Sequence, residues 1–281
     1  MFKQLAIAAL YATAALAQLP TVAHTGTPTG EEKVINGLNI YHAYAPSKSA
    51  EHAIIFLTDI FGLALPANKL LADSYARAGY LVLMPDYFKG DPQPQDRTGF
   101  NSTGWAARHP QAEIEQFVGQ TVDYAKSLGV KKLGAAGFCF GGPYVVRILA
   151  GKGVDVGLIA HPGKFSDEEL NAIKGPLSVA AAETDQSLPP ARRHEVESLL
   201  QKKNATYQIN LYSGVSHGFA VRIDLNDPKQ VFAKESAFYQ AKFWFDQWLK
   251  GGSPAKTGAA ALKYSNNRGD MRIQHDFDYT S

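Results

Sequence analysis

The stretch that decides the fold is GFCFGG (Gly137–Gly142), which contains the only cysteine among the 281 residues. A run of small and apolar residues before it predicts a buried strand (133–136). The nearly all-apolar segment after it (143–150) predicts a helix with proline in its first turn. A strand, a G-x-C-x-G-G turn and a helix form the cysteine version of the nucleophile elbow. We therefore expect the thiol of Cys139 to be exposed at the carboxyl edge of a sheet, on a strained backbone.

The glycines of this stretch support a tight turn. Side chains at Gly137 and Gly141 would collide there with neighbouring backbone. A thiol at a helix N-terminus also lies at the positive end of the helix dipole, which favours the thiolate of Cys139. A buried structural cysteine beside a glycine turn is the alternative. The preceding strand, the glycine spacing and the apolar helix favour a nucleophile.

The composition is that of an ordinary globular protein, with 45% hydrophobic and 19% charged residues. The length suits one large α/β domain. A net charge of +2 and the lack of a dense Lys/Arg cluster predict neither a nucleic-acid partner nor a membrane partner. With a single cysteine no internal disulfide can form. An unpaired thiol is a liability in an oxidising compartment unless it is buried or used, so we expect the Cys139 thiol to be functional and to lie in a shielded pocket.

The N-terminus has the features of a secretory signal peptide. Lys3 supplies a positive charge, an apolar alanine-rich segment (5–16) follows, and an A-x-A site ends at Ala17. This segment is too short to span a membrane. We therefore expect cleavage after Ala17 and secretion to the extracellular space. Two sequons, at Asn101 and Asn204, are candidate N-glycosylation sites on that route.

Strands alternate with helices along the rest of the chain, which predicts a mostly parallel, doubly wound α/β sheet with helices on both faces. We expect an extended N-terminal arm (18–30), one domain (31–250) and a polar C-terminal tail (251–281). The patterns predict a hairpin at 34–41, strands at 53–57, 80–84, 133–136, 156–160, 177–182 and 207–211, helices at about 66–78, 114–128, 143–150, 190–203 and 231–248, and a long loop at 90–104.

Functional groups of such a sheet gather on loops at the carboxyl ends of strands. Cys139, Asp185 and His217 each follow a predicted strand. Their order along the chain is nucleophile, acid and histidine, as in α/β-hydrolases. A thiol needs a base to take its proton, and the base needs a carboxylate to fix its tautomer. These three residues are therefore the candidate catalytic triad.

Each member of this triad has an alternative. Glu183 competes with Asp185 for the role of the acid, and Asp185 could instead be a carboxylate ahead of the next helix. His217 could be a core histidine, although its loop is polar and rich in glycine. His161 also follows a strand, but we expect it to be structural or to line the pocket. No pair of histidines has metal-ligand spacing with a third partner, so we predict no metal and no cofactor.

Five motifs carry a resemblance to a known family. They are TDIFG (Thr58–Gly62), MPD (Met84–Asp86), the GFCFGG elbow, ETD (Glu183–Asp185) and SHGFA (Ser216–Ala220). With them the chain resembles the dienelactone hydrolase family of α/β-hydrolases over about residues 31–249. The resemblance implies a cysteine hydrolase acting on lactones or small esters, with Cys139 as nucleophile, His217 as base and Asp185 as acid. It also implies an oxyanion hole formed by the backbone N–H groups of Ile60 and Phe140.

The chain departs from the family pattern around the substrate. Asp59 stands where bacterial members carry a glutamate that holds the resting thiol. Those members also bind the substrate carboxylate with two arginines, and here Lys89 and Arg222 lie beside the corresponding positions. The aromatic residues of these loops predict a more apolar pocket, and they are Phe61, Tyr87, Phe88, Phe140 and Phe219.

The sequence thus predicts a secreted, cofactor-free cysteine hydrolase that cleaves a lactone or small carboxylic ester through a thioester on a Cys-His-Asp triad. Its partner would be a small-molecule substrate. A non-catalytic secreted binding protein on a hydrolase scaffold is the alternative, since a fold alone does not determine function. A redox role for the lone thiol would need an intermolecular partner.

Overall fold

The structure is a computed structural model that describes residues 20–251. The predicted signal peptide (1–17) and nearly all of the predicted polar tail lie outside these residues. The strands are β1 (Glu31–Ile35), β2 (Leu38–Ala43), β3 (His52–Leu57), β4 (Leu81–Pro85), β5 (Lys132–Phe138), β6 (Val156–Ala160), β7 (Leu177–Thr184) and β8 (Tyr207–Ser216). The helices are η1 (Gly62–Ala64), α1 (Pro66–Arg77), α2 (Ser102–Arg108), α3 (Gln111–Ser127), α4 (Gly141–Ile148), α5 (Asp167–Ala172), α6 (Pro190–Lys202) and α7 (Pro228–Leu249).

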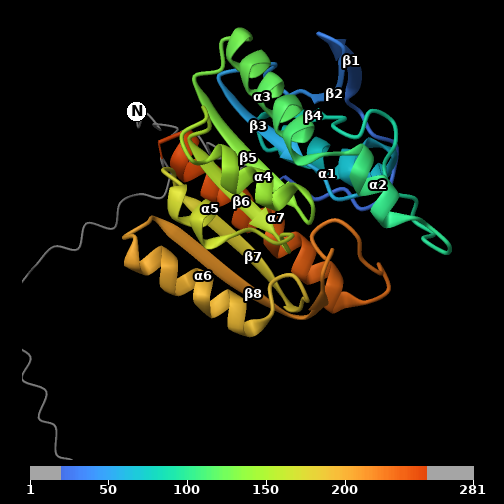
Figure 1. Ribbon diagram of the computed structural model, residues 1–281. Coiled ribbons are helices and arrows are strands. Elements are labelled where there is room, and N and C mark those ends of the chain that lie inside the picture. The colour runs from blue at the N-terminus through green and yellow to red at the C-terminus, as the bar shows by residue number, and fades with distance from the viewer. Residues whose placement is uncertain (1–19, 252–281) are drawn as a thin grey trace, which may run out of the picture. The chain divides into compact units, whose positions relative to one another are not determined.

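The eight strands form one sheet in the order β1-β2-β4-β3-β5-β6-β7-β8 (Figure 1). The pairs β1–β2 and β2–β4 are antiparallel, and every other pair is parallel. Parallel strands need helical crossovers, and these cover both faces of the sheet. The predicted doubly wound α/β fold is therefore confirmed.

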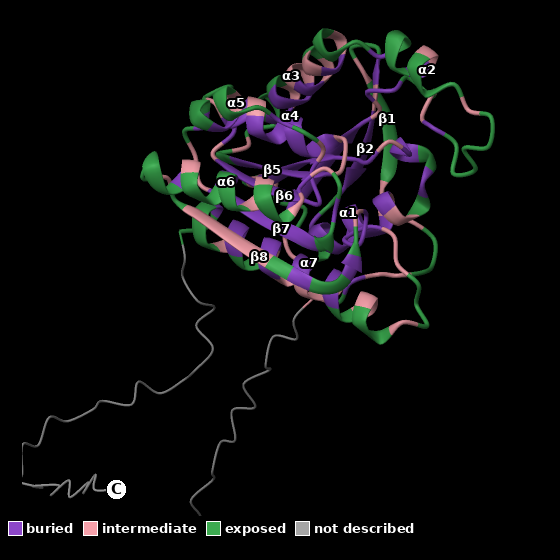
Figure 2. Cartoon of the chain, turned by 60° about the horizontal axis from the view of Figure 1, so that its bottom comes forward, coloured by how far each residue is buried: buried purple, intermediate pink, exposed green. Residues whose placement is uncertain are grey.

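The core has two layers because successive side chains of a buried strand point to opposite faces. In β3, Ile54 and Phe56 pack in the layer that contains α1 and α7, whereas Ile55 and Leu57 pack in the layer that contains α3, α4, α5 and α6. Figure 2 shows the consequence, with buried strands at the centre and exposed surface on the outer sides of the helices. The carboxyl ends of the central strands thus lie at one edge of a rigid double-sided sheet.

The predicted hairpin is confirmed in its turn and its register. Ile35 of β1 pairs with Leu38 of β2 across the two residues Asn36 and Gly37. These two have φ values of 50° and 82°, as a type I′ turn requires. The Asn-Gly pair therefore sets the register of the antiparallel edge of the sheet.

The sequence-based elements need correction in several places, and helix α5 was not predicted at all. The predicted loop at 90–104 ends early, because Asn101 caps the short helix α2 and accepts a hydrogen bond from the N–H of Gly104 at 2.8 Å. Strand β8 runs five residues beyond its predicted end, through polar positions that alternation does not identify. The predicted arm packs on the domain, since the N–H of Ala23 donates to Ser74 and that of Thr29 to Asp73.

Within residues 20–251, no helix combines the length and the hydropathy that crossing a membrane would require.

Replacing Phe56 tests how much core packing contributes to the stability of the domain. Phe56 is fully buried and its ring stacks on that of Phe138 at 4.6 Å between centroids. We expect Phe56→Ala to lower the free energy of unfolding by about 3–5 kcal/mol, from lost burial and the cavity left behind. Urea unfolding measures the change. The control is Phe232→Ala on α7, where a side chain that is 70% exposed should change stability by less than about 0.5 kcal/mol.

Candidate active site

Cys139 occupies the turn between β5 and α4, with a φ of 50° in the left-handed region. A non-glycine residue there carries strain of about 1–3 kcal/mol, which the surrounding structure must offset. The Cys139 N–H donates to the Ala160 carbonyl at 3.2 Å, and the Cys139 carbonyl accepts from the Gly163 N–H at 2.7 Å. The thiol is free and half-buried. The predicted elbow is therefore present, with the sulfur at the N-terminus of a buried helix.

The two glycines of the elbow are required by close backbone approach. A Cβ atom at Gly137 would lie 2.6 Å from the Gly141 carbonyl oxygen. One at Gly141 would lie 2.2 Å from the carbonyl oxygen of Leu57, at the end of β3. Both distances are well inside van der Waals contact. This confirms the steric reason predicted from the sequence.

Pairing of β7 with β8 brings His217 to Asp185. The strands remain paired as far as Thr184 and Ser216, and the His217 N–H then donates to the Thr184 carbonyl at 3.1 Å. As a result, His217 Nδ1 lies 2.9 Å from Asp185 Oδ2 and 3.0 Å from Oδ1. The Asp185 side chain is fully buried, whereas that of His217 is 29% exposed. A buried carboxylate thus orients an imidazole that solvent can reach.

Asp185, and not Glu183, is the carboxylate that contacts the histidine. Asp185 Oδ1 also accepts a hydrogen bond from the Ser187 N–H at 2.8 Å, which fixes the carboxylate within its own turn. Glu183 is turned to β8, where it accepts from the Gly214 N–H at 2.6 Å. Helix α6 begins only at Pro190. The competing roles considered for these two acids are therefore resolved in favour of Asp185 as partner of His217.

The electrostatics of the site favour a charged imidazole. Burial alone would lower the pKa of His217, but hydrogen bonds to Asp185 and Cys139, together with their negative charges, outweigh it and raise the pKa to about 10. An imidazole with this pKa holds its proton throughout the neutral range. It faces the Cys139 sulfur on one side and is stabilised by the Asp185 carboxylate on the other.

The two backbone N–H groups expected to form an oxyanion hole are available. Phe140 follows Cys139 at the start of α4, and Ile60 lies in the loop after β3. These segments are tied together because the Gly141 N–H donates to the Thr58 carbonyl at 3.0 Å. Among residues 20–251, neither the Phe140 nor the Ile60 N–H has a hydrogen-bond acceptor.

A second charged pair lies beside the triad. Arg222 Nε is 3.1 Å from Asp59 Oδ2, and the guanidinium lies over the Phe61 ring at 4.7 Å. A Cβ at Gly218 would lie 2.6 Å from Arg222 Nη2, so the glycine after His217 allows the guanidinium to approach this loop. The Arg222 side chain is 37% exposed, whereas that of Asp59 is buried. One side of the guanidinium therefore remains open to solvent.

Comparison with known proteins agrees with this geometry. The dienelactone hydrolase family matches residues 39–249. The chain is 45% identical to the hydrolase PyvD of Aspergillus violaceofuscus, over 81% of this chain and 94% of the relative. It is 32% identical to dienlactone hydrolase 1 of Gibberella moniliformis, over 80% of this chain and 90% of the relative.

The chain belongs to the dienelactone hydrolase family. Its fold also matches the crystal structure of the dienelactone hydrolase of Anabaena variabilis, with a TM-score of 0.59 at 15% identity, over 79% of this chain and 99% of that one. The family predicted from the five sequence motifs is confirmed, and with it a hydrolase on an α/β-hydrolase fold.

Two residues predicted to lie in the substrate pocket, Asp59 and Lys89, are bound to other side chains. Both oxygens of Asp59 are used, Oδ1 by the Phe61 N–H at 3.1 Å and Asn68 at 2.9 Å, and Oδ2 by Arg222. The structure therefore places Asp59 as partner of Arg222, not as partner of the resting thiol. Lys89 Nζ binds Glu113 on α3 at 2.6 Å. Arg222 is thus the cation beside the triad.

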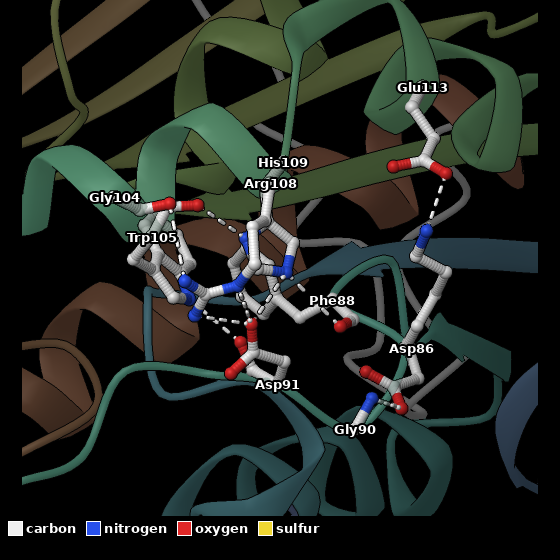
Figure 3. Close-up of polar contacts among 10 residues, drawn as sticks. Asp86, Phe88, Gly90, Asp91, Gly104, Trp105, Arg108, His109 and Glu113 are labelled. Carbon is white, nitrogen blue, oxygen red and sulfur yellow. Dashed lines mark hydrogen bonds and ion pairs between the residues drawn. The ribbon is translucent and has the colours of Figure 1, made fainter.

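Of the aromatic residues predicted for the pocket, Phe140 packs on Phe88 and also on Trp105, which was not predicted. Phe140 lies 5.1 Å from Phe88 and 6.0 Å from Trp105 between ring centroids. Figure 3 shows how α2 is tied to the loop after β4, since Trp105 donates to the Asp91 carbonyl at 2.7 Å and Arg108 pairs with the Asp91 carboxylate at 2.8 Å. These contacts hold apolar rings against the residue next to the nucleophile.

Sequence reasoning missed two residues that hold the site together. Asn68 on α1 is fully buried and bonds both Asp59 and the Gly62 carbonyl, and Trp105 belongs to α2, a helix that the sequence analysis did not predict. A lone asparagine in an amphipathic helix carries no distinguishing pattern. Phe219 was predicted to line the pocket, but its side chain is buried and packs on the His161 ring at 5.6 Å between centroids. Among the described residues no cluster of histidine, cysteine and acidic side chains has the arrangement of a metal site.

The close approach at Gly141 predicts a sensitive position. We expect Gly141→Ala to destabilise the domain and reduce hydrolysis, because the new methyl would force the elbow away from Leu57. Thermal unfolding and ester hydrolysis measure the two effects.

The matched control is Gly119→Ala in α3. A Cβ at Gly119 would meet no atom within 4 Å. We expect this variant to raise stability by about 0.5–1 kcal/mol through higher helix propensity, with unchanged activity. Equal effects of the two variants would contradict the steric account.

Proposed function

We propose that this family member is a secreted cysteine hydrolase that opens a lactone or cleaves a small carboxylic ester through a thioester on Cys139. The observation that carries the proposal is the chain of contacts from Cys139 to His217 to Asp185 at one edge of the sheet. Relatives named dienlactone hydrolase and carboxymethylenebutenolidase homolog support an ester or lactone substrate. Secretion rests on the predicted signal peptide with cleavage after Ala17.

The reaction begins from a thiolate and an imidazolium. The Cys139 sulfur attacks the carbonyl carbon, and the carbonyl oxygen takes up the negative charge. The N–H groups of Ile60 and Phe140 stabilise this oxyanion, and losing one such donor typically costs about 3–4 kcal/mol of transition-state stabilisation. His217 then gives its proton to the leaving alkoxide as the carbon–oxygen bond breaks, which leaves an acyl thioester on the sulfur.

Hydrolysis of the thioester reverses these roles. Neutral His217 takes a proton from water, and the resulting hydroxide attacks the thioester carbonyl. The carbon–sulfur bond breaks to release the carboxylic acid and restore the thiolate beside the imidazolium. Throughout both steps Asp185 keeps Nδ1 protonated, so that the other ring nitrogen faces the reacting atoms.

The surroundings of the triad favour a substrate with an apolar body. The half-buried Phe140 ring offers apolar contact next to the oxyanion site, and the buried rings of Phe88 and Trp105 hold it in place. The open side of the Arg222 guanidinium could accept a negatively charged substituent, as an arginine fork does for carboxylates. The exposed sequons Asn101 and Asn204 are compatible with glycosylation of a secreted form.

Removing the nucleophile tests the proposal directly. We expect Cys139→Ala to lower the hydrolysis of an aryl ester or lactone by at least about 10³-fold, because the covalent route is lost. Thermal unfolding of this variant should still show a cooperative transition, because alanine keeps the Cβ that the left-handed backbone already accommodates. Hydrolysis at the wild-type rate by a pure Cys139→Ala sample would refute the mechanism.

The carboxylate can be tested through pH. The pKa of His217 is raised above its unfolded value, so the stabilisation of its charged form is complete below about pH 6.5 and is lost as the pH rises through about 10. We expect Asp185→Asn to remove much of this stabilisation and to lower kcat/KM at neutral pH by about 10²–10⁴-fold.

Iodoacetamide alkylation of Cys139 measures the same change without a substrate. The pH midpoint for alkylation should be higher in Asp185→Asn than in the wild type, because an imidazolium that loses its proton more easily stabilises the thiolate less. The control is Glu183→Gln, which alters a neighbouring acid that contacts β8 only. Equal midpoints in the wild type and Asp185→Asn would contradict the assigned role.

A further inference from the structure

His161 lies directly after β6, beneath the catalytic histidine. Its ring is fully buried, and its centroid lies 5.2 Å from that of His217, with 65° between the ring planes. Phe219 and Phe138 pack on it at 5.6 Å and 6.2 Å. The backbone of His161 has a φ of 36°, in the left-handed region. The chain thus adopts a strained conformation that places this ring against His217.

Packing alone does not explain a histidine at this position. Neither Nδ1 nor Nε2 of His161 has a hydrogen-bond partner among residues 20–251. Burying unpaired polar atoms destabilises a fold, and a phenyl ring could occupy similar space without them. His42 shows the ordinary arrangement of a buried histidine, with Nδ1 at 2.9 Å from the Ile40 carbonyl and Nε2 at 3.1 Å from the Tyr124 hydroxyl.

The surroundings keep His161 uncharged. Burial lowers its pKa well below 6.5, and the positive charges of His217 and Arg222 lower it further. Cys139 and Asp185 act instead on His217, whose pKa they raise to about 10. Two imidazoles in contact cannot both carry a charge at low cost, and the two negative partners select His217. At neutral pH the pair therefore consists of one imidazolium and one neutral imidazole.

A neutral imidazole has one nitrogen that carries a proton and one that carries a lone pair. Because no other group binds either nitrogen of His161, both tautomers are available to it. We propose that His161 is a positioning residue that turns its lone-pair edge toward the His217 imidazolium and so stabilises the thiolate–imidazolium pair. This inference rests on the thiolate–imidazolium pair of the proposed function. It gives a role to His161, the second imidazole of the site.

The test is His161→Phe in the mature chain, assayed by the pH dependence of iodoacetamide alkylation of Cys139. Phenylalanine keeps a ring against His217 but has no lone pair. We expect the alkylation midpoint to rise by about half to one pH unit, which is about a three- to tenfold loss of thiolate stabilisation. We expect kcat to fall on the acidic side of the pH profile with KM unchanged. We also expect the melting temperature to rise, since two unpaired nitrogens are removed.

The matched control is His42→Phe, which replaces a buried histidine whose two nitrogens are both paired. We expect a lower melting temperature and an unchanged alkylation midpoint. A general effect of removing a buried histidine would move both variants in the same direction. Only a role through His217 raises the midpoint while the fold becomes more stable.

A second variant, His161→Leu, also lacks the nitrogens and should raise the midpoint in the same way. A wild-type midpoint in either folded variant overturns the role of His161. Failure of the proposed function is distinguishable, because the wild type would then alkylate with the midpoint of an ordinary thiol, near about 8.5. A wild-type midpoint below about 7, with no shift in the variants, rejects this inference alone.

Discussion

The close approach of the α4 N-terminus to the end of β3 is the constraint on which the active site depends. With no side chain at Gly141, its N–H can donate to the Thr58 carbonyl at 3.0 Å, and this bond ties the elbow to the neighbouring loop. On the other side, the Cys139 N–H is held by the Ala160 carbonyl of β6 at 3.2 Å. Cys139 is therefore fixed from both flanking strands. The same bonds tie the segment of Phe140 to the loop of Ile60, whose N–H groups the proposed mechanism uses together for the oxyanion.

The charges around this point fall into two pairs that do not exchange partners. Asp185 is bound by the Ser187 N–H and by His217, and Asp59 by Asn68, the Phe61 N–H and Arg222. A free buried arginine next to the triad would compete with His217 for the thiolate. Pairing with Asp59 offsets that charge, while the partly exposed guanidinium remains able to meet a substrate. Asp59, where the family resemblance implies a glutamate that holds the resting thiol, thus has Arg222 as its partner in this second pair.

The elements that could be predicted are those whose cause is local. A few adjacent residues are enough to predict the Asn-Gly turn, the apolar strands and the glycine elbow. The same is true of the helix N-termini at Pro66 and Pro190. The pairing of His217 with Asp185 was also accessible, because chain order and strand ends restrict it. What could not be predicted depends on contacts distant in sequence. Asn68 on α1 binds Asp59, and Arg222 binds the same carboxylate although 163 positions separate the two residues. Glu183 accepts a hydrogen bond from Gly214 on β8. No periodicity or spacing encodes such pairs.

Backbone strain distinguishes functional turns from ordinary ones in this fold. Six non-glycine residues among the described ones have positive φ, and four of them (Asn36, Lys48, Lys89 and Asn204) lie in exposed turns where solvent accommodates the conformation. The other two are Cys139 and His161, half-buried and buried, at neighbouring strand ends. Interior strain cannot relax into solvent, so the fold must offset it with the packing of two apolar layers. This strain is found at Cys139 and His161, whose side chains approach His217 from different directions. A more relaxed backbone at either position would turn its side chain away from that ring, which ties the stability of the sheet to the chemistry at its edge.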